Sequence, residues 1–168
     1  MILNNAELYY VQMDPKRPAK AKDKNKPDYW VCQVRTTDKE VKKAWQEANI
    51  NATAVVPDEG EPYYKVSFKR NTINAKGEEA ECPEIVNGNL DTVDPTTIGN
   101  GSIGNIRLFQ HKYEAGDGFA AGISSVLMGL QLTKHIIYVK DKEEFSKTET
   151  EVISPETKSM VEEDDVTY

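Results

Sequence analysis

The segment YWVCQVRT, residues 29–36, alternates between apolar and polar side chains. Alternation with a period of two is typical of a β-strand that packs one face on a core and leaves the other face in water. The inward face would hold Trp30, Cys32 and Val34, and the outward face would hold Tyr29, Gln33 and Arg35. We therefore expect a half-buried strand here, and the neighbouring segments extend the pattern.

Other strand-like segments occur on both sides of this one. They are LYYVQM at 8–13, YYKVSFKR at 63–70, a returning segment up to Val86, NIRLFQHKYE at 105–114, and the apolar run 122–139. The apolar run is long enough for a helix, but Gly129 and the β-branched cluster at 136–139 favour one bent strand or two strands. About six short strands of this kind predict an all-β protein, either a small barrel or a sandwich.

One segment between the second and third strands changes to helical spacing. Between 38 and 49, apolar side chains recur every three or four residues at Val41, Ala44, Trp45 and Ala48. Asp38 stands where a helix N-cap is expected. Residues 74–77 predict a turn, and the stretch 87–104, rich in Gly, Asn, Asp and Thr, predicts a loop.

The net charge of −7 is unevenly distributed along the 168 residues. Residues 1–140 contain 18 Lys and Arg against 18 Asp and Glu, whereas residues 141–168 contain 3 against 10. We therefore predict one domain over 1–145 and a disordered acidic tail over 146–168. Because the acidic excess lies in the tail, the low isoelectric point does not exclude nucleic acid as a partner of the domain.

Several other classes of protein fit the sequence poorly. The chain lacks a run of roughly 18 apolar residues, and its start lacks the plan of a signal peptide, so we expect a cytoplasmic protein without a membrane partner. Cys32 and Cys82 match no metal spacing and are expected to be reduced thiols.

No enzymatic motif stands in a convincing context. GNGSIG at 99–104 matches G-x-G-x-x-G, but a loop precedes it and a predicted strand follows it, where a dinucleotide site needs a strand and then a helix. His111 and His135 have no nucleophile nearby in the sequence. A metal-dependent nuclease is a weaker alternative, in which the acids at 78–84 would bind the metal ion. These acids flank a predicted turn and are more typical of a solvated hairpin. We expect no catalytic residue, metal or cofactor.

The strand at 105–114 carries the strongest binding signal. One face combines a cation with flat rings, namely Arg107, Phe109, His111 and Tyr113. Binding to a single strand of nucleic acid needs cations for the phosphates and rings on which unstacked bases can lie. The alternative is that Phe109 and Tyr113 belong to the core.

A second wall of the same groove is predicted from the third strand and two isolated cations. It would contain Tyr63, Lys65, Lys69 and Arg70, with Arg35 and Lys134. Residues 16–26 hold six basic side chains and one acid, so this loop would add long-range attraction that salt weakens.

The end of the chain combines a run of acids with a terminal ring. The residues are Glu162, Glu163, Asp164, Asp165 and Tyr168. Such a segment can serve as a short docking peptide, or as a DNA mimic that occupies the basic groove of the same protein.

The order of these features resembles the single-stranded DNA-binding proteins of podovirus-type bacteriophages. The resemblance runs over roughly residues 5–145 plus the tail: a strand, a basic loop, YWVCQVRT, a helix, YYKVSFKR, the Gly-rich loop, NIRLFQHKYE, a Gly-plus-aliphatic strand, and an acidic end with an aromatic residue. It implies an OB-fold that coats single strands during phage DNA replication, recombination and repair in the infected bacterial host.

The resemblance also implies roles for particular residues and partners. It implies DNA contacts by Tyr63, Lys65, Lys69, Arg107, Phe109 and Tyr113, and a tail at 162–168 that contacts the phage DNA polymerase and helicase and often links dimers. The alternative function is a phage accessory module that uses a small β-barrel to hold another protein.

Overall fold

The computed structural model describes residues 1–138. They contain seven strands, one α-helix and one 3-10 helix, joined by loops. Their order is β1 (Ile2–Gln12), β2 (Tyr29–Thr36), α1 (Lys39–Glu47), β3 (Thr53–Val55), β4 (Tyr63–Asn71), β5 (Glu84–Val86), η1 (Pro95–Thr97), β6 (Ser102–Tyr113) and β7 (Gly122–Lys134). The predicted domain boundary at 145/146 and the predicted tail lie outside these residues. None of the helices in 1–138 is long and apolar enough to cross a membrane.

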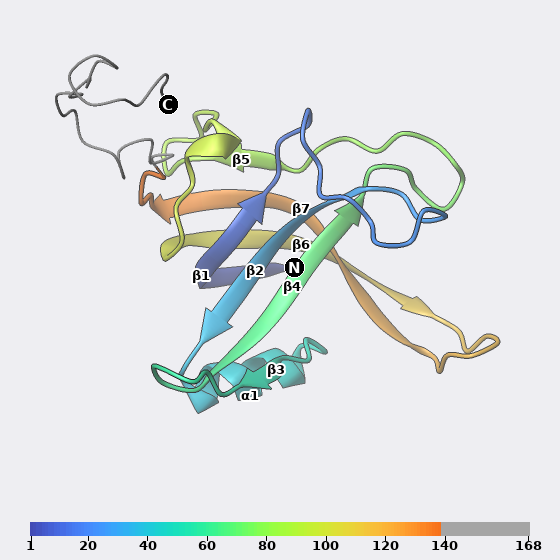
Figure 1. The fold of residues 1–168 in the computed structure, drawn as a ribbon, viewed down its shortest axis with the longest axis horizontal. Helices are drawn as coiled ribbons and strands as arrows, with labels where there is room; N and C mark the ends of the chain where they lie inside the picture. The colour runs from blue at the N-terminus through green and yellow to red at the C-terminus, as the bar shows by residue number, and fades with distance from the viewer. Residues whose placement is uncertain (139–168) are drawn as a thin grey trace, which may run out of the picture.

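Five of the strands close into a barrel (Figure 1). Antiparallel pairs join β1 to β2 and to β6, β2 to β4, and β6 to β7. A parallel pair between Lys69 of β4 and Val126 of β7 completes the ring. The short strands β3 and β5 extend it beside β4 and β7. This is the predicted OB-fold-like, all-β barrel with one helix between β2 and β3.

The core follows the predicted alternation. Trp30, Cys32 and Val34 of β2 are buried, as are Ile106 and Leu108 of β6. The other buried apolar side chains come from every side of the barrel, including Leu8, Met13, Trp45, Phe68, Leu127, Leu130 and Leu132. Because the inward positions of these strands are apolar and buried, the side chains at the alternate positions face outward.

Helix α1 lies with β3 at one end of the barrel (Figure 1). It begins as predicted, because the Asp38 side chain accepts a hydrogen bond from the Glu40 N–H at 2.8 Å. The predicted apolar stripe is wrong in part: Trp45 is buried and Ala48 packs on the core, whereas Val41 and Ala44 are exposed. One large ring is therefore the main anchor of the helix.

Strand β1 begins at Ile2, earlier than the predicted start at Leu8. Its register shifts twice, and Asn5 and Tyr10 have φ values of 55° and 52°. The N–H groups of these two residues donate to the side chains of Asn105 and Asn100, at 3.1 and 2.8 Å. The polar start of β1 thus becomes a strand because β6 and the loop before it supply its hydrogen bonds.

Two further differences concern the second half of the chain. Strand β6 begins at Ser102, inside the predicted loop, and η1 lies within that loop. The apolar run forms one long strand, β7, up to Lys134, because β6 pairs with it along almost its whole length.

Candidate nucleic-acid interface

The outward side of β2 and β4 is a basic and aromatic surface, which we name the strand face. In the antiparallel register Arg35 lies opposite Lys65, and Val31 lies opposite Lys69. Within residues 1–138 the one ion pair joins Lys20 to Asp28 at 3.0 Å, so no cation of the strand face forms an ion pair in this part of the chain. One acid, Glu7 of β1, lies opposite Arg35 and accepts a hydrogen bond from the Tyr9 hydroxyl. These cations are available for phosphate groups.

Arg35 lies among three tyrosines, and these four residues form what we name the tyrosine–arginine cluster. The guanidinium carbon is 4.1 Å from the ring centre of Tyr9, 4.4 Å from that of Tyr63 and 5.5 Å from that of Tyr10. Arg35 Nε donates to Gln33 Oε1 at 2.7 Å. Cation–π contacts and this hydrogen bond therefore fix a flat cation among flat rings.

The shift in β1 is what allows two neighbouring tyrosines to approach the same cation. In a regular strand Tyr9 and Tyr10 would point to opposite faces. The register of β1 against β2 shifts between Tyr9 and Gln12, and the positive φ at Tyr10 turns the chain there. Both rings consequently lie within 6 Å of the Arg35 guanidinium carbon.

The hydroxyl of Tyr9 is held in its neutral form. Partial burial raises the pKa of Tyr9 above its ordinary value, and the charge of Glu7 and a 3.2 Å hydrogen bond to its carboxylate act in the same direction. The tyrosine therefore acts as a neutral hydrogen-bond donor and an aromatic surface.

The basic loop predicted at 16–26 flanks the strand face. A hollow of about 690 Å³ is lined by Lys22 and Lys26 of the loop and by Tyr29 and Lys69 of the strands. Lys69 Nζ lies 4.5 Å from the ring centre of Tyr29. The loop thus adds its cations to one end of the strand face.

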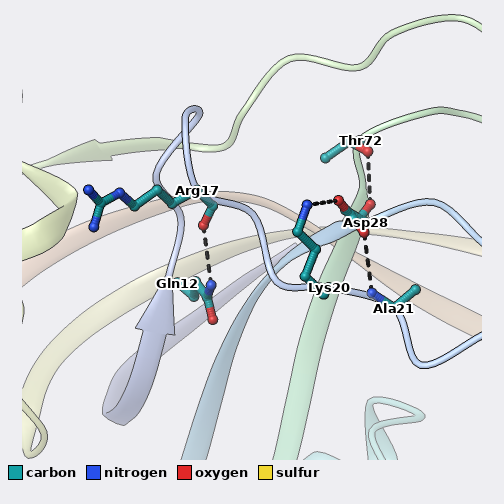
Figure 2. Close-up of polar contacts among 6 residues, drawn as sticks. All are labelled: Gln12, Arg17, Lys20, Ala21, Asp28 and Thr72. Atoms are coloured by element: carbon teal, nitrogen blue, oxygen red, sulfur yellow. Dashed lines mark hydrogen bonds and ion pairs between the residues drawn. The ribbon is translucent and has the colours of Figure 1, made fainter.

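Asp28 ties the basic loop to the barrel (Figure 2). Its carboxylate accepts from Lys20 Nζ at 3.0 Å and from the Ala21 N–H at 3.3 Å, and its carbonyl accepts from the Thr72 hydroxyl at 2.9 Å. The hydrogen bond from Lys20, followed by that from Ala21, lowers the pKa of Asp28. Gln12 Nε2 donates to the Arg17 carbonyl at 3.2 Å, which fixes the start of the loop (Figure 2).

The outer halves of β6 and β7, 109–113 and 122–126, form a two-stranded extension of the barrel that we name the ribbon (Figure 1). Phe109 and His111 stack with ring centres 5.8 Å apart and an interplanar angle of 20°. Phe109 is 56% exposed and Tyr113 is 41% exposed, so the alternative that these rings belong to the core is wrong.

Two aromatic rings at the tip of the ribbon pack directly against glycines. A Cβ atom at Gly122 would lie 2.5 Å from the Tyr113 hydroxyl, and one at Gly116 would lie 2.6 Å from the Phe119 ring. The rings of Tyr113 and Phe119 are 6.1 Å apart and tilted by 60°. Each ring therefore packs across a position without a side chain.

Lys69 also belongs to a second hollow, between the strand face and the ribbon. This hollow, of about 890 Å³, is lined by Lys69 and Arg70 of β4 and by Phe109 and His111 of β6, among others. Arg70 Nη1 donates to Met128 Sδ at 3.1 Å. The structure thus brings most of the predicted residues onto one continuous path: Arg35, Tyr63, Lys65, Lys69, Arg70, Phe109, His111 and Tyr113.

Two predicted residues lie away from this path. Arg107 lines a separate depression with Ile2 and Glu84, and its Nη2 donates to the Met128 carbonyl at 3.4 Å. The β6–β7 register shifts directly after Arg107, so the strand bends between this residue and Phe109. Lys134 lies opposite Ile103, at the other end of β7 from the ribbon.

The sequence prediction missed four aromatic side chains on this path: Tyr9, Tyr10, Tyr29 and Phe119. The doublet of tyrosines in β1 was a usable signal, because one member of a doublet in a strand must face outward. The placement of Tyr10 and Phe119 depends on a bulge and on a loop, which carry no periodic signal.

The remaining motifs do not form a second site in the described residues. In the Gly-rich segment the buried Ser102 hydroxyl donates to the Gly99 carbonyl at 2.7 Å, and strand β6 follows in place of a helix. Residues 1–138 contain no group of three or more His, Cys, Asp or Glu side chains placed to hold a metal ion. Burial raises the pKa of Cys32 to about 12 and that of Cys82 to about 11, so both thiols are weak nucleophiles.

Comparison with known proteins identifies solved structures of similar fold. No family model matches the chain, and no curated protein matches it in sequence. The single-stranded DNA-binding protein of bacteriophage Enc34, solved in complex with single-stranded DNA, superimposes with a TM-score of 0.54 at 11% identity, over 80% of this chain and 86% of that one.

Two further structures are similar. Another structure of the Enc34 protein gives a TM-score of 0.50 at 9% identity, over 84% of each chain. The single-stranded DNA-binding protein gp2.5 of bacteriophage T7 gives 0.48 at 14% identity, over 89% of this chain and 96% of that one. The described part of this chain shares its fold with the single-stranded DNA-binding protein of bacteriophage Enc34.

Proposed function

We propose that this protein binds single-stranded DNA of a bacteriophage, with little sequence preference, and coats it during replication, recombination and repair in the infected bacterium. The observation that carries the proposal is the strand face, where Arg35 and Lys69 lie against tyrosine rings, Lys65 lies opposite Arg35, and none of the three forms an ion pair in residues 1–138. In OB-folds, oligonucleotides bind on the face of the second and third barrel strands and on the two loops beside it.

That general binding surface corresponds to particular elements of this chain. The second and third barrel strands are β2 and β4, the first loop is the basic loop, and the second loop joins the two strands of the ribbon. The rings would stack on unpaired bases and the cations would neutralise phosphates, so any base would be accepted. The role is that of a binding protein and requires no catalytic group.

We assign the tail a separate role on the basis of its sequence. The acids at 162–165 and Tyr168 would compete with DNA for the cations of the strand face and would recruit the phage DNA polymerase and helicase. The same segment would link two copies where the protein forms a dimer.

The test is fluorescence anisotropy of labelled oligo-dT with the full-length protein over a salt series, with duplex DNA as competitor. We expect tight binding that weakens steeply with salt and a much lower affinity for duplex. No binding at low salt, with the tail removed as well, would contradict the proposal and favour a protein–protein module.

A further inference from the structure

We infer that the Arg35 guanidinium occupies a slot for one nucleobase between Tyr9 and Tyr63, and that a base replaces it when single-stranded DNA binds. The inference rests on the proposed function and deepens it. In the free protein the two tyrosines contact the Arg35 guanidinium. In the complex they would contact a base, and Arg35 would contact a phosphate.

The register of the strands shows that Arg35 lies between the two rings. β2 is the middle strand, flanked by β1 and β4. Tyr9 comes from β1, where it pairs with Gln33, and Tyr63 comes from β4, beyond the Arg35–Lys65 pair. The two tyrosines thus approach Arg35 from opposite flanks and from opposite directions along β2.

The spacing suits a flat group of the thickness of a base. The guanidinium carbon is 4.1 Å from one ring centre and 4.4 Å from the other. A guanidinium and a nucleobase are both planar and both stack on aromatic faces. A base entering between the rings would therefore restore, on each tyrosine, the stacking contact that the guanidinium gives up.

Arg35 is free to take a new partner when it leaves the slot. Among residues 1–138 its guanidinium makes one hydrogen bond, from Nε to Gln33, and no ion pair. Its terminal nitrogens have no carboxylate to release in this part of the chain. A phosphate of the bound strand would give them charge-assisted hydrogen bonds, which are stronger than contacts with a neutral ring.

The exchange predicts that irradiation can cross-link bases of the bound strand to both Tyr9 and Tyr63. The full-length protein is irradiated with an oligo-dT that contains 5-iodouracil, and the cross-linked peptides are mapped by mass spectrometry. Cross-links at Tyr9 and at Tyr63 are expected. Cross-links confined to other residues, such as Phe109 or Tyr113, would overturn the inference and leave the proposed function standing, whereas failure to bind oligo-dT would overturn the proposed function.

A second experiment separates base contacts from phosphate contacts. Affinities for oligo-dT and for an abasic oligonucleotide of equal length are compared among variants that retain the wild-type melting temperature. Tyr63→Ala should weaken oligo-dT binding about tenfold and leave abasic binding unchanged, while Tyr63→Phe should behave as wild type. Arg35→Ala should weaken oligo-dT binding and leave abasic binding close to wild type, because an abasic strand has no base to displace the guanidinium from the slot toward a phosphate.

An equal loss on both strands in Arg35→Ala would show that Arg35 contacts a phosphate without being displaced by a base, and would overturn the exchange. Arg35→Lys serves where Arg35→Ala does not fold. It keeps the charge without the planar group, so both affinities should stay within about threefold of wild type. A much larger loss of oligo-dT affinity in this variant would show that the guanidinium itself stacks on a base, and would also overturn the exchange.

Discussion

Lys69 of β4 and Val126 of β7 lie opposite each other in the parallel pair that closes the barrel. Through this pair the strand face continues into the ribbon, because Lys69 lines both the hollow beside the basic loop and the hollow beside Phe109 and His111. Closure of the barrel and continuity of the candidate DNA path thus depend on the same position.

Lys69→Gln should weaken oligo-dT binding and reduce the slope of log affinity against log salt by about 0.7, the value for one phosphate contact on a single strand. The measurement is anisotropy across a salt series. Lys134→Gln is the comparison. Lys134 lies eight residues beyond Val126, the β7 partner of Lys69, which is about 26 Å along the strand at roughly 3.3 Å per residue. Equal losses in the two variants would extend the DNA path to the far end of β7.

Replacing both Phe109 and Tyr113 with Ala should weaken binding by about tenfold or more, because each ring stacked on a base contributes about 1–3 kcal/mol. Both rings lie outside the core, at 56% and 41% exposure, so the free energy of unfolding in urea should change by less than about 1 kcal/mol. Leu108→Ala changes the buried position between Arg107 and Phe109, and it should lower the free energy of unfolding by about 2–5 kcal/mol. Wild-type affinity in the double variant would place the DNA site elsewhere.

Gly104→Ala should destabilise the barrel by about 1–3 kcal/mol in urea unfolding. A Cβ atom at this position would lie 2.6 Å from the Gln131 carbonyl oxygen, which is fixed backbone. Gly88→Ala is the matched control, because a Cβ there meets nothing within 4 Å, and its stability should stay close to that of wild type. Similar losses in the two variants would mean that the β6–β7 register is looser than described.

The carboxyl of Asp28 should titrate below the ordinary pKa of 3.8, and an NMR titration of its side chain measures this. A lowered pKa means that the anchoring of the basic loop is fully present above the unfolded-state pKa and is lost as pH falls through the lower, folded value. Lys20→Gln should raise this pKa, since the Lys20 hydrogen bond is its largest cause. An unchanged midpoint in that variant would contradict the ion pair.

Removal of residues 146–168 should tighten oligo-dT binding at low salt, with a smaller effect at high salt, because competing charges are then screened. Changing the acids at 162–165 to their amides in the full-length chain should reproduce the effect. Unchanged affinity in both proteins would exclude competition between the tail and DNA.

Local patterns were sufficient to predict the strands that build the core and the face that each presents. Trp30, Cys32 and Val34 point inward, while Arg35 and its neighbours on the strand face point outward, as alternation predicts. The same reasoning placed Phe109, His111 and Tyr113 outside the core. Burial of alternate side chains is a property of each strand by itself, so it can be read from a single segment.

Other features depend on which strand pairs with which, and no local pattern contains that information. The bulge at Tyr10 is satisfied by Asn100, a residue 90 positions away, and it brings Tyr10 toward Arg35. The shift after Arg107 separates that residue from Phe109, although both are outward positions of β6.

The sequence by itself thus determined an all-β protein, the inward and outward faces of its main strands, and a basic, aromatic surface, because these follow from side-chain periodicity and composition. Only the tertiary structure decided that Tyr9, Arg35 and Tyr63 form one cluster and that Lys69 joins the strand face to the ribbon. The physical reason is that bulges, register and barrel closure are set by hydrogen bonds between distant segments.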